Sequence, residues 1–352
     1  MNPYDFVPID LNRPPSTEEP LEHDAFRGHS GRLFCRIKVI RPIFIPDPKD
    51  LRQYKGQRNH KTLNRFFTLE SKYAIPASSL KGVIRSVAEA AANSCLSLFS
   101  GEYSYRHRNR RVYRDYSQLL PRGFKSCKTG DSLCITCRLF GMLSDKNVFM
   151  GKVSISDAFL DEAKIHKFME PVTLVILSNP KPHYEPSYIT RVGGQKYIAG
   201  RKFYFHNPKI LMSAQKTHLN STVKPLEQGE FTFVVDYFNL KTNELNLLVY
   251  SLVLEDYMYH KIGMGKPAGL GTVKITIEKL YEISNKRYEN FSQRSKEVTS
   301  QDLSTFINDA MLDFISNNTD PQTNSPYPNL TKLREILRYP PVHANIQYPD
   351  QQ

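Results

Sequence analysis

The apolar residues of this chain change their spacing in a fixed order, and that order limits the folds open to it. A first predicted strand over residues 33–45 alternates its apolar side chains, at Leu33, Cys35, Ile37 and Val39. Between Leu80 and Ala91 the apolar residues recur at helical spacing, and Ser79 is the expected cap of that helix. A strand that packs against an amphipathic helix is therefore the first predicted unit.

The later segments again change between the alternating spacing of strands and the spacing of a helix. They predict strands at 151–155, 172–177, 230–237 and 272–277, and a second amphipathic helix from Thr242. The order strand, helix, strands, helix, strand is that of a ferredoxin-like α+β domain. A further amphipathic helix at 303–314 lies in a polar tail.

The chain of 352 residues is long enough for two domains, or for one core with large insertions. We expect an N-terminal arm over residues 1–30, a main domain over 31–285 with an insertion at about 101–137, and a helical tail over 286–352. The polar segment from Asp47 to Glu70 has no periodicity and is expected to be a loop. No apolar run approaches 18 residues and the N-terminus has no apolar signal region, so we expect a cytoplasmic protein with no membrane contact.

Positive charge is the first indication of a partner. Lys and Arg number 48 against 35 acids, and the excess is concentrated in residues 106–128 and 186–226. A charged patch can simply be a solvated face, but two patches rich in Arg and Tyr favour a polyanion, with nucleic acid as the expected partner.

The basic insertion contains three cysteines in a stretch of eleven residues, Cys127, Cys134 and Cys137. Zn²⁺ takes four nitrogen or sulfur ligands in a tetrahedron, and Cys95 or else His107 is available as the fourth. A redox pair at Cys134 and Cys137, or thiols without a ligand, are the alternatives. With five cysteines in a reducing compartment we expect a structural zinc ion that fastens the insertion.

Two segments are suited to phosphate binding. The helix start offers Ser78, Ser79 and Lys81, with Arg85 one turn further, where the helix dipole favours an anion. Between the second helix and the last strand, four glycines and a lysine let backbone approach a ligand closely, at Gly263, Gly265, Lys266, Gly269 and Gly271. Plain helix capping and a tight connection are the alternative interpretations.

Two alternating runs flank Gly193-Gly194, which predicts a β-hairpin. Aromatic and cationic residues interleave on it without acids, at Tyr188, Arg191, Lys196, Tyr197, Arg201 and Lys202. Aromatic faces stack on bases while cations follow phosphates, so the hairpin favours nucleic acid over its alternative, a protein contact.

These features in this order resemble the RAMP superfamily of CRISPR-associated proteins, and more narrowly the backbone subunits of type III effector complexes. The resemblance covers about residues 33–277. It rests on the helix start, the glycine loop and two further segments, Cys137-Arg138-Leu139-Phe140-Gly141 and Gly151-Lys152-Val153-Ser154-Ile155-Ser156-Asp157-Ala158.

The resemblance implies a palm that is like an RNA-recognition motif and a thumb hairpin at about residues 178–200. Such subunits line up along a CRISPR RNA with other effector subunits, and the thumb wedges into the duplex of guide and target RNA. It also implies that an Asp in the loop after the first strand can cut target RNA with Mg²⁺ or Mn²⁺. Here that loop offers Asp47 and Asp50, although it is basic and lacks the usual Gly-Gly start.

Two rival functions remain open on the sequence. One is a CRISPR RNA-processing endoribonuclease of the same superfamily, with His60 as its base. The other is a zinc-containing RNA-binding protein unrelated to CRISPR.

Overall fold

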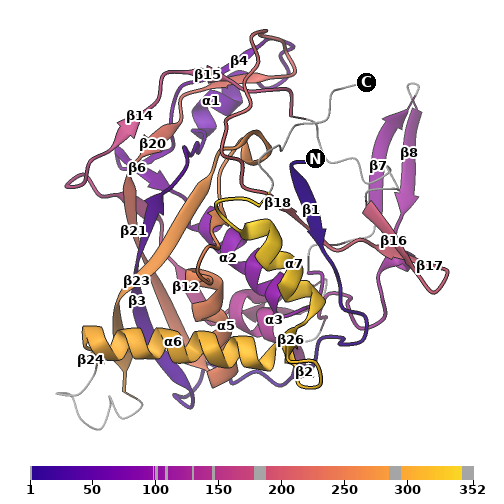
Figure 1. Cartoon of the computed structure of the whole chain (residues 1–352), viewed down its shortest axis with the longest axis vertical. Helices are drawn as coiled ribbons and strands as arrows, with labels where there is room; N and C mark the ends of the chain where they lie inside the picture. Colours follow the sequence, from indigo (N-terminus) through magenta and orange to yellow (C-terminus); the bar gives the residue numbers. More distant parts are fainter. Residues whose placement is uncertain are drawn as a thin grey trace.

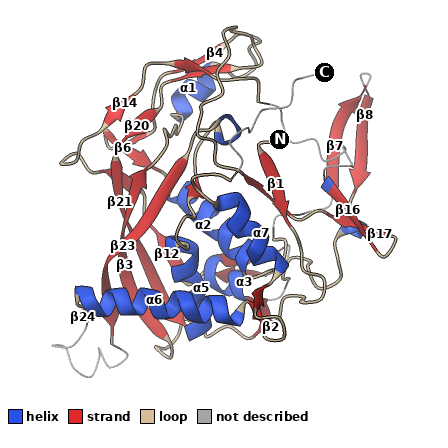
Figure 2. Ribbon diagram, viewed as in Figure 1, coloured by secondary structure: helices blue, strands red, loops and turns tan. Residues whose placement is uncertain are grey.

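The computed structural model describes residues 2–97, 99, 102–107, 110–128, 131–144, 147–177, 188–284 and 295–342. A curled antiparallel sheet runs along one side of the molecule, and the helices gather against it (Figures 1 and 2). Its long strands are β3 (His29–Val39), β21 (Glu230–Leu240) and β23 (Thr272–Ile283). Residues 178–187, the start of the expected thumb, lie outside the described part of the chain.

The order of the strands places β3 at the centre of the sheet. β23 and β21 flank it, and β21 in turn pairs with β12 (Val153–Ile155) and β13 (Ala158–Leu160), all antiparallel. The sheet continues through β6 (Lys72–Ile75) to β5 (Thr68–Leu69) on one side, and β22 (His260–Lys261) and β24 (Ser295–Glu297) pair with β23 on the other. The alternation predicted for the first strand is confirmed, since Leu33, Cys35, Ile37 and Val39 are all buried, but this strand ends at Val39.

One face of the sheet is covered by α2 (Ala77–Ala91) and α5 (Thr242–Val253). Leu80, Ile84 and Val87 of α2 join the sheet residues in one apolar core. The helices α6 (Ser300–Asn317) and α7 (Pro328–Leu337) add Phe314 and Leu330 to that same core, so the tail packs on the main domain. Sequence spacing did not predict α7, a ten-residue helix between proline-containing segments.

The opposite face of the sheet carries ion pairs in place of an apolar layer. Arg36 on β3 contacts Asp161 at 2.9 Å and Glu230 at 3.0 Å, and also pairs with Glu278. Arg32 pairs with Asp236 at 2.6 Å. In these ion pairs four carboxylates face two arginines.

The segment from Asp47 to Glu70, expected as a loop, contains regular structure. It forms α1 (Pro48–Gln53), β4 (Lys61–Leu63) and β5, and it packs beside four short strands, β14 (Lys167–Phe168), β15 (Val172–Thr173), β19 (Ser221–Val223) and β20 (Leu226–Gln228). Strands of two or three residues have no periodicity to detect, so this region was missed. The strand expected at 172–177 is shorter than predicted and covers only Val172–Thr173.

The insertion and the segment directly after it are built from small elements. They are the hairpin β7 (Glu102–His107) and β8 (Arg110–Asp115), the turn η1 (Ser117–Leu119), β9 (Leu133–Cys134), α3 (Ile135–Phe140), and the pair β10 (Gly141–Leu143) and β11 (Val148–Met150). The hairpin β7–β8 projects beside a second hairpin (Figure 1).

That second hairpin is the one predicted around Gly193-Gly194. Its strands are β16 (Ile189–Val192) and β17 (Gln195–Ile198), and both glycines have positive φ, as a two-residue turn requires. β18 (Arg201–Tyr204) follows and pairs with β1 (Tyr4–Val7). The expected N-terminal arm is therefore fixed to the molecule, by β1 and by β2 (Thr17–Glu18), which pairs with β9.

The remaining elements are η2 (Lys266–Ala268) in the glycine loop and the tail pair β25 (Thr319–Asp320) and β26 (Ser325–Pro326). Among the helices of the described chain, none has both the length and the apolar character that spanning a bilayer demands.

Candidate nucleic-acid interface and metal centre

A groove of about 590 Å³ lies where the start of α2, the strand β18 and the glycine loop meet. Segments distant in sequence converge there, and five of the residues expected to bind RNA line it: Ser78, Ser79, Lys202, Gly263 and Lys266. Among the described residues that form its walls, none is acidic. The groove is therefore a concave, positively charged surface.

Three lysines give the groove its charge, and each is partly withdrawn from water. Burial lowers the pKa of Lys202 and of Lys266. Lys261 is buried, and desolvation, together with the charges of Lys266 and Arg41, lowers its pKa to about 7. Desolvated ammonium groups gain from an anionic partner, because the partner restores the stability of the charged form. The sequence analysis missed Lys261, although it lies two residues before the glycine loop.

The glycines of this loop are required by its backbone conformation and by its close packing. All four have positive φ. A side chain at Gly263 would meet the Phe44 carbonyl oxygen, and side chains at Gly269 and Gly271 would overlap the carbonyl oxygens of Lys209 and Ile262. The loop thus packs against its own protein backbone, and only Gly263 among them lines the groove.

The start of α2 differs from the expectation. Its cap is Pro76, and Ser79 lies inside the first turn. The side chain of Asp157 accepts a hydrogen bond from the Ala77 amide at 2.6 Å, so a residue from the strand connection β12–β13 satisfies the helix end. Ser78 and Ser79 are left to face the groove.

The two cations expected on α2 are differently placed. Arg85 donates to Glu89 at 2.9 Å and to the Gly141 carbonyl at 3.1 Å, so it is engaged within the protein. Lys81 is half-buried, and desolvation and the neighbouring Arg85 lower its pKa. Neither residue lines the groove.

The hairpin β16–β17 leaves Arg191 exposed and Lys196 and Tyr197 half-buried. The Tyr197 hydroxyl donates to Gln195 at 2.7 Å. Tyr188 lies at the base of the hairpin, where its ring packs against Phe6 at 5.1 Å. The structure thus keeps Arg191 and Tyr197 on the projecting part and uses Tyr188 to anchor it.

Lys202 and Arg201 are neighbours with different surroundings. The Lys202 ammonium lies 3.6 Å from the centre of the Tyr4 ring and 3.1 Å from the Tyr188 hydroxyl, while its side chain still reaches the groove. Arg201 points inward and is buried, with 8% of its surface exposed. It is not accessible to RNA in this structure.

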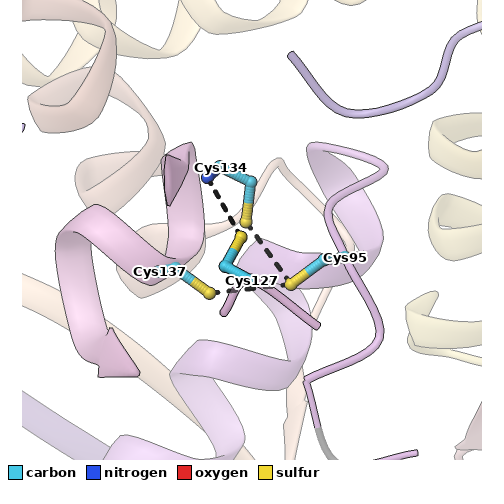
Figure 3. A group of neighbouring side chains, drawn as sticks. All are labelled: Cys95, Cys127, Cys134 and Cys137. Atoms are coloured by element: carbon cyan, nitrogen blue, oxygen red, sulfur yellow. Dashed lines mark hydrogen bonds between the residues drawn. The ribbon is translucent and has the colours of Figure 1, made fainter. Parts of the chain in front are cut away.

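Four cysteine thiols converge beside the end of α2 (Figure 3). Cys95, Cys127, Cys134 and Cys137 place their sulfur atoms within 4.8 Å of one another. The Sγ of Cys95 lies 3.5 Å from that of Cys134 and 3.6 Å from that of Cys137. Zn–S bonds of about 2.3 Å in a tetrahedron set neighbouring sulfur atoms about 3.8 Å apart. The four-thiol set therefore fits a tetrahedral metal ion.

Electrostatics around the four thiols also fits a cation. Hydrogen bonds from Cys127, Cys137 and Cys95 hold the pKa of Cys134 well below its usual range, while hydrogen bonding with its neighbours raises the pKa of Cys137. Hydrogen bonding within the cluster also lowers the pKa of Cys127 and raises that of Cys95, so two thiolates are favoured over the other two, and a bound metal ion would stabilise all four together. Cys95, the preferred fourth residue in the sequence analysis, joins the cluster; the side chain of His107 lies outside the described part of the chain.

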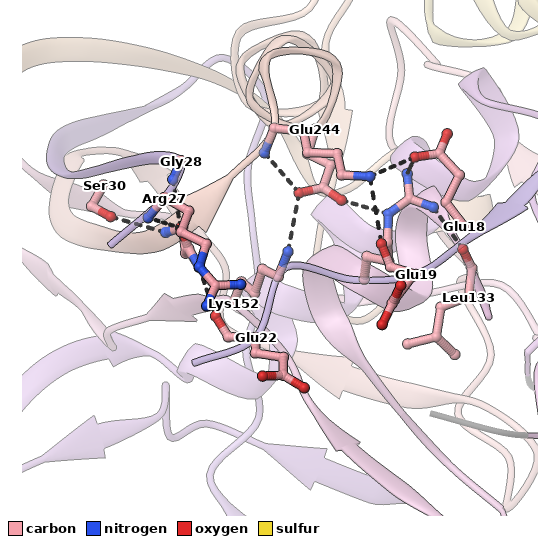
Figure 4. Close-up of polar contacts among 12 residues, drawn as sticks. Glu18, Glu19, Glu22, Arg27, Gly28, Ser30, Leu133, Lys152 and Glu244 are labelled. Atoms are coloured by element: carbon pink, nitrogen blue, oxygen red, sulfur yellow. Dashed lines mark hydrogen bonds and ion pairs between the residues drawn. The ribbon is translucent and has the colours of Figure 1, made fainter. Parts of the chain in front are cut away.

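A buried charge network fixes the insertion to α5 (Figure 4). Glu244 accepts from Arg138 at 2.5 Å and lies 3.4 Å from the Lys152 ammonium, and all three side chains are almost fully buried. Arg138 also donates to the Leu133 carbonyl at 2.6 Å, beside Cys134. Arg138 and Lys152 were noted in the sequence as part of recurring segments, but their shared partner was not.

The two carboxylates expected to cut RNA are buried and hydrogen-bonded locally. Asp47 caps α1 through the Lys49 amide at 2.7 Å. Asp50 accepts from the Arg65 amide at 3.0 Å and pairs with its guanidinium at 3.5 Å. Both carboxylates thus hold the segment in shape, and a catalytic role for either remains a prediction.

His60, the candidate base of a processing enzyme, has partners at both ring nitrogens. Nδ1 lies 2.9 Å from the Thr217 carbonyl oxygen, and Nε2 lies 2.8 Å from the Thr222 hydroxyl. In this arrangement His60, directly before β4, contacts both β19 and the segment before it, and both of its ring nitrogens are engaged within the protein.

Comparison with known proteins identifies the family. The family model of the RAMP superfamily matches residues 36–274, well over half of the chain. A chain in a solved structure entitled "Type IV-B CRISPR Complex" is 16% identical, with a TM-score of 0.36 over 70% of this chain and 90% of its own length. No curated protein matches significantly. The family assignment stands on the first of these matches: the chain belongs to the RAMP superfamily.

Proposed function

We propose that this RAMP superfamily member is a CRISPR RNA-binding backbone subunit of a type III effector complex. Its ferredoxin-like palm would consist of β3, α2, β12–β13, β21, α5 and β23, whose strand order in the sheet, β23–β3–β21–β13, is the one such a domain requires. The partners are CRISPR RNA, target RNA and other effector subunits.

The groove carries the proposal. It collects Lys202, Lys261 and Lys266 around the serines of α2, without an acid among the described residues that line it. Lysines give affinity for phosphates with little information on sequence, which suits a subunit that must hold any guide. RNA phosphates in the groove would return the lowered pKa values of these lysines toward their ordinary range.

The open face of the sheet is less suited to RNA than the groove, which supports the groove as the RNA-binding surface. An RNA-recognition motif usually stacks bases on aromatic residues of that face. Here Arg36 and Arg32 are neutralised by carboxylates on the same face, which repel phosphate. The groove is therefore the better surface for the RNA, and the hairpin β16–β17 would act as the thumb through the exposed Arg191 and the half-buried Tyr197.

Photo-crosslinking of RNA that contains 4-thiouridine distinguishes the two surfaces. Crosslinks are expected on peptides that contain Ser78–Lys81, Gly263–Lys266 or the hairpin. Crosslinks concentrated on the exposed face of β3 and β21 would contradict the groove model.

The CRISPR-specific part has a test of its own. RNA that co-purifies with the tagged protein from its native cell should be enriched in repeat-spacer transcripts of uniform length, together with effector subunits. Recovery of general cellular RNA in their place would contradict a role in an effector complex.

The four cysteines are proposed to hold one structural Zn²⁺. Their geometry fits a tetrahedral thiolate site in which four sulfur atoms supply the four ligands of a structural ion. The ion, when bound, supplies four strong bonds that fasten the insertion to the end of α2. Elemental analysis should find about one zinc per chain; protein purified without any metal would contradict the site.

A further inference from the structure

Arg201 has a buried guanidinium group that the groove does not use. It begins β18, directly after the hairpin β16–β17. Its Nη2 donates to the carbonyl oxygens of Ser94 and, at 3.1 Å, of Cys95. Among the described residues, Nε and Nη1 have no hydrogen-bond partner, although both are shielded from water. A buried cation left this incomplete is costly unless an anion lies nearby.

The surroundings of Arg201 offer two kinds of anion. Glu89 interacts with it electrostatically, and so do the thiols of Cys95 and Cys134. The Glu89 carboxylate already accepts from Arg85 at 2.9 Å and from the Ser97 hydroxyl at 2.6 Å. Glu89 is thus committed to Arg85, and Arg201 remains as a positive charge beside the cysteine cluster.

We propose that Arg201 is the counter-cation of a four-thiolate metal centre, which stabilises the metal-bound form from outside the ligand set. The inference rests on the metal site proposed above. Four thiolates around a divalent ion carry a net charge of −2, so the loaded centre supplies the anion that Arg201 lacks. With neutral thiols the guanidinium retains only the electrostatic interaction with Glu89, a carboxylate that Arg85 and Ser97 already engage.

The position of Arg201 gives this pairing a consequence for the hairpin. The residue joins β18, the strand that follows the hairpin, to the backbone of Ser94 and Cys95, just after the end of α2. Loss of the metal leaves its charge unbalanced, and we expect the start of β18 to open to solvent. The metal centre would then hold the base of the thumb as well as the insertion.

Release of zinc to a chromogenic chelator measures the pairing directly in the full-length protein. Arg201→Met removes the charge and keeps much of the apolar volume, and Arg201→Lys restores a positive charge. Lys202→Met is the matched control, because it removes a cation from the next position of the same strand. We expect Arg201→Met to release zinc about tenfold faster, as for other groups that support metal ligands. Arg201→Lys should recover most of the loss, and Lys202→Met should release zinc at the wild-type rate.

If the wild-type protein holds zinc and a folded Arg201→Met variant releases it at the wild-type rate, the pairing is wrong and the metal site stands. If the wild-type protein holds no zinc, the metal site itself is wrong.

Limited trypsin digestion gives a second test that needs no variant. Removal of the metal should speed cleavage after Arg201 and leave cleavage after the exposed Arg191 unchanged. Equal cleavage after Arg201 with and without metal would overturn the inference.

Discussion

The palm and the insertion are stabilised by different interactions. The palm has strands of 11 and 12 residues and a continuous apolar core that includes Leu33, Ile84 and Phe231. The insertion has strands of two to six residues, and its apolar clusters are small: one contains Leu133, Met142 and the cysteines, and the other contains Leu96, Leu120 and Phe124. Burial of apolar area is therefore enough for the palm, whereas the insertion depends on thiols and buried charges.

Removal of the metal should give the largest difference in stability between the two regions. Cys134→Ser should abolish zinc binding and loosen the insertion, while the palm keeps its protection, because only the insertion lacks a core of its own. Hydrogen exchange read by mass spectrometry, beside zinc content, measures both. Cys35→Ala is the control, since Cys35 is a buried cysteine of the palm and lies outside the cluster. Loss of protection in β3 and β21 to the same degree would contradict the difference between the regions.

The buried network gives the next largest effect. Glu244→Gln leaves Lys152 buried without a carboxylate and leaves Arg138 with only Glu18, 3.9 Å away, and breaking such a group costs about 3–5 kcal/mol. Chemical denaturation measures the loss of unfolding free energy. Glu278→Gln is the matched control: Glu278 pairs with Arg36 but is 40% exposed, so we expect less than about 1 kcal/mol. Equal losses in the two variants would show that burial of the network contributes nothing.

The same contrast explains what sequence could predict. The periodicity of apolar residues predicted the long strands and the helices α2 and α5, and the cysteine spacing indicated the four-thiol cluster. The network could not be found this way, because Glu244 lies 106 residues from Arg138 and 92 from Lys152. Ser79 was expected to cap α2, but the cap contact comes from Asp157, 80 residues away from Ala77. Contacts that depend on tertiary packing leave no local pattern.

Arg201 is a candidate functional residue for which the sequence prediction of an accessible side chain was wrong. Its sequence neighbours Tyr197 and Lys202 suggested an RNA contact, yet β18 turns its side chain inward. Alternation along a strand predicts which residues share a face, but not which face meets the core when both neighbours are polar or aromatic.

The projecting hairpin is expected to affect RNA binding through stacking. Tyr197→Ala should weaken RNA binding by roughly 1–3 kcal/mol if the ring stacks on a base, with little change in salt dependence. Fluorescence anisotropy with labelled RNA measures it. Tyr257→Ala, at an exposed tyrosine outside the hairpin and the groove, should have no effect. A loss equal to that of Tyr197→Ala would mean that the hairpin has no special part in binding.

The segment around α1 has the smallest expected stability effect and tests cleavage as well. Asp47→Ala removes the helix cap and should cost about 1 kcal/mol in thermal or chemical unfolding. If the assembled complex cuts target RNA at this subunit, Asp47→Ala or Asp50→Ala should stop that cut and leave guide binding intact. Such cutting should need Mg²⁺ or Mn²⁺, because a lone carboxylate cannot stabilise the developing charge. Normal cutting by both variants would exclude them as the catalytic acids.

The salt dependence of RNA binding by Lys266→Ala tests the central claim, that the groove holds RNA phosphates, most directly. Lys266 lines the groove, and Lys164, an exposed lysine on the loop after β13, provides the control variant Lys164→Ala. Affinity for several RNAs of unrelated sequence is measured between about 50 and 200 mM salt. The account predicts that Lys266→Ala weakens binding to all of them similarly and reduces the slope of log affinity against log salt by up to about one, while Lys164→Ala changes neither. An unchanged affinity and slope for Lys266→Ala would contradict the groove as the path of the RNA.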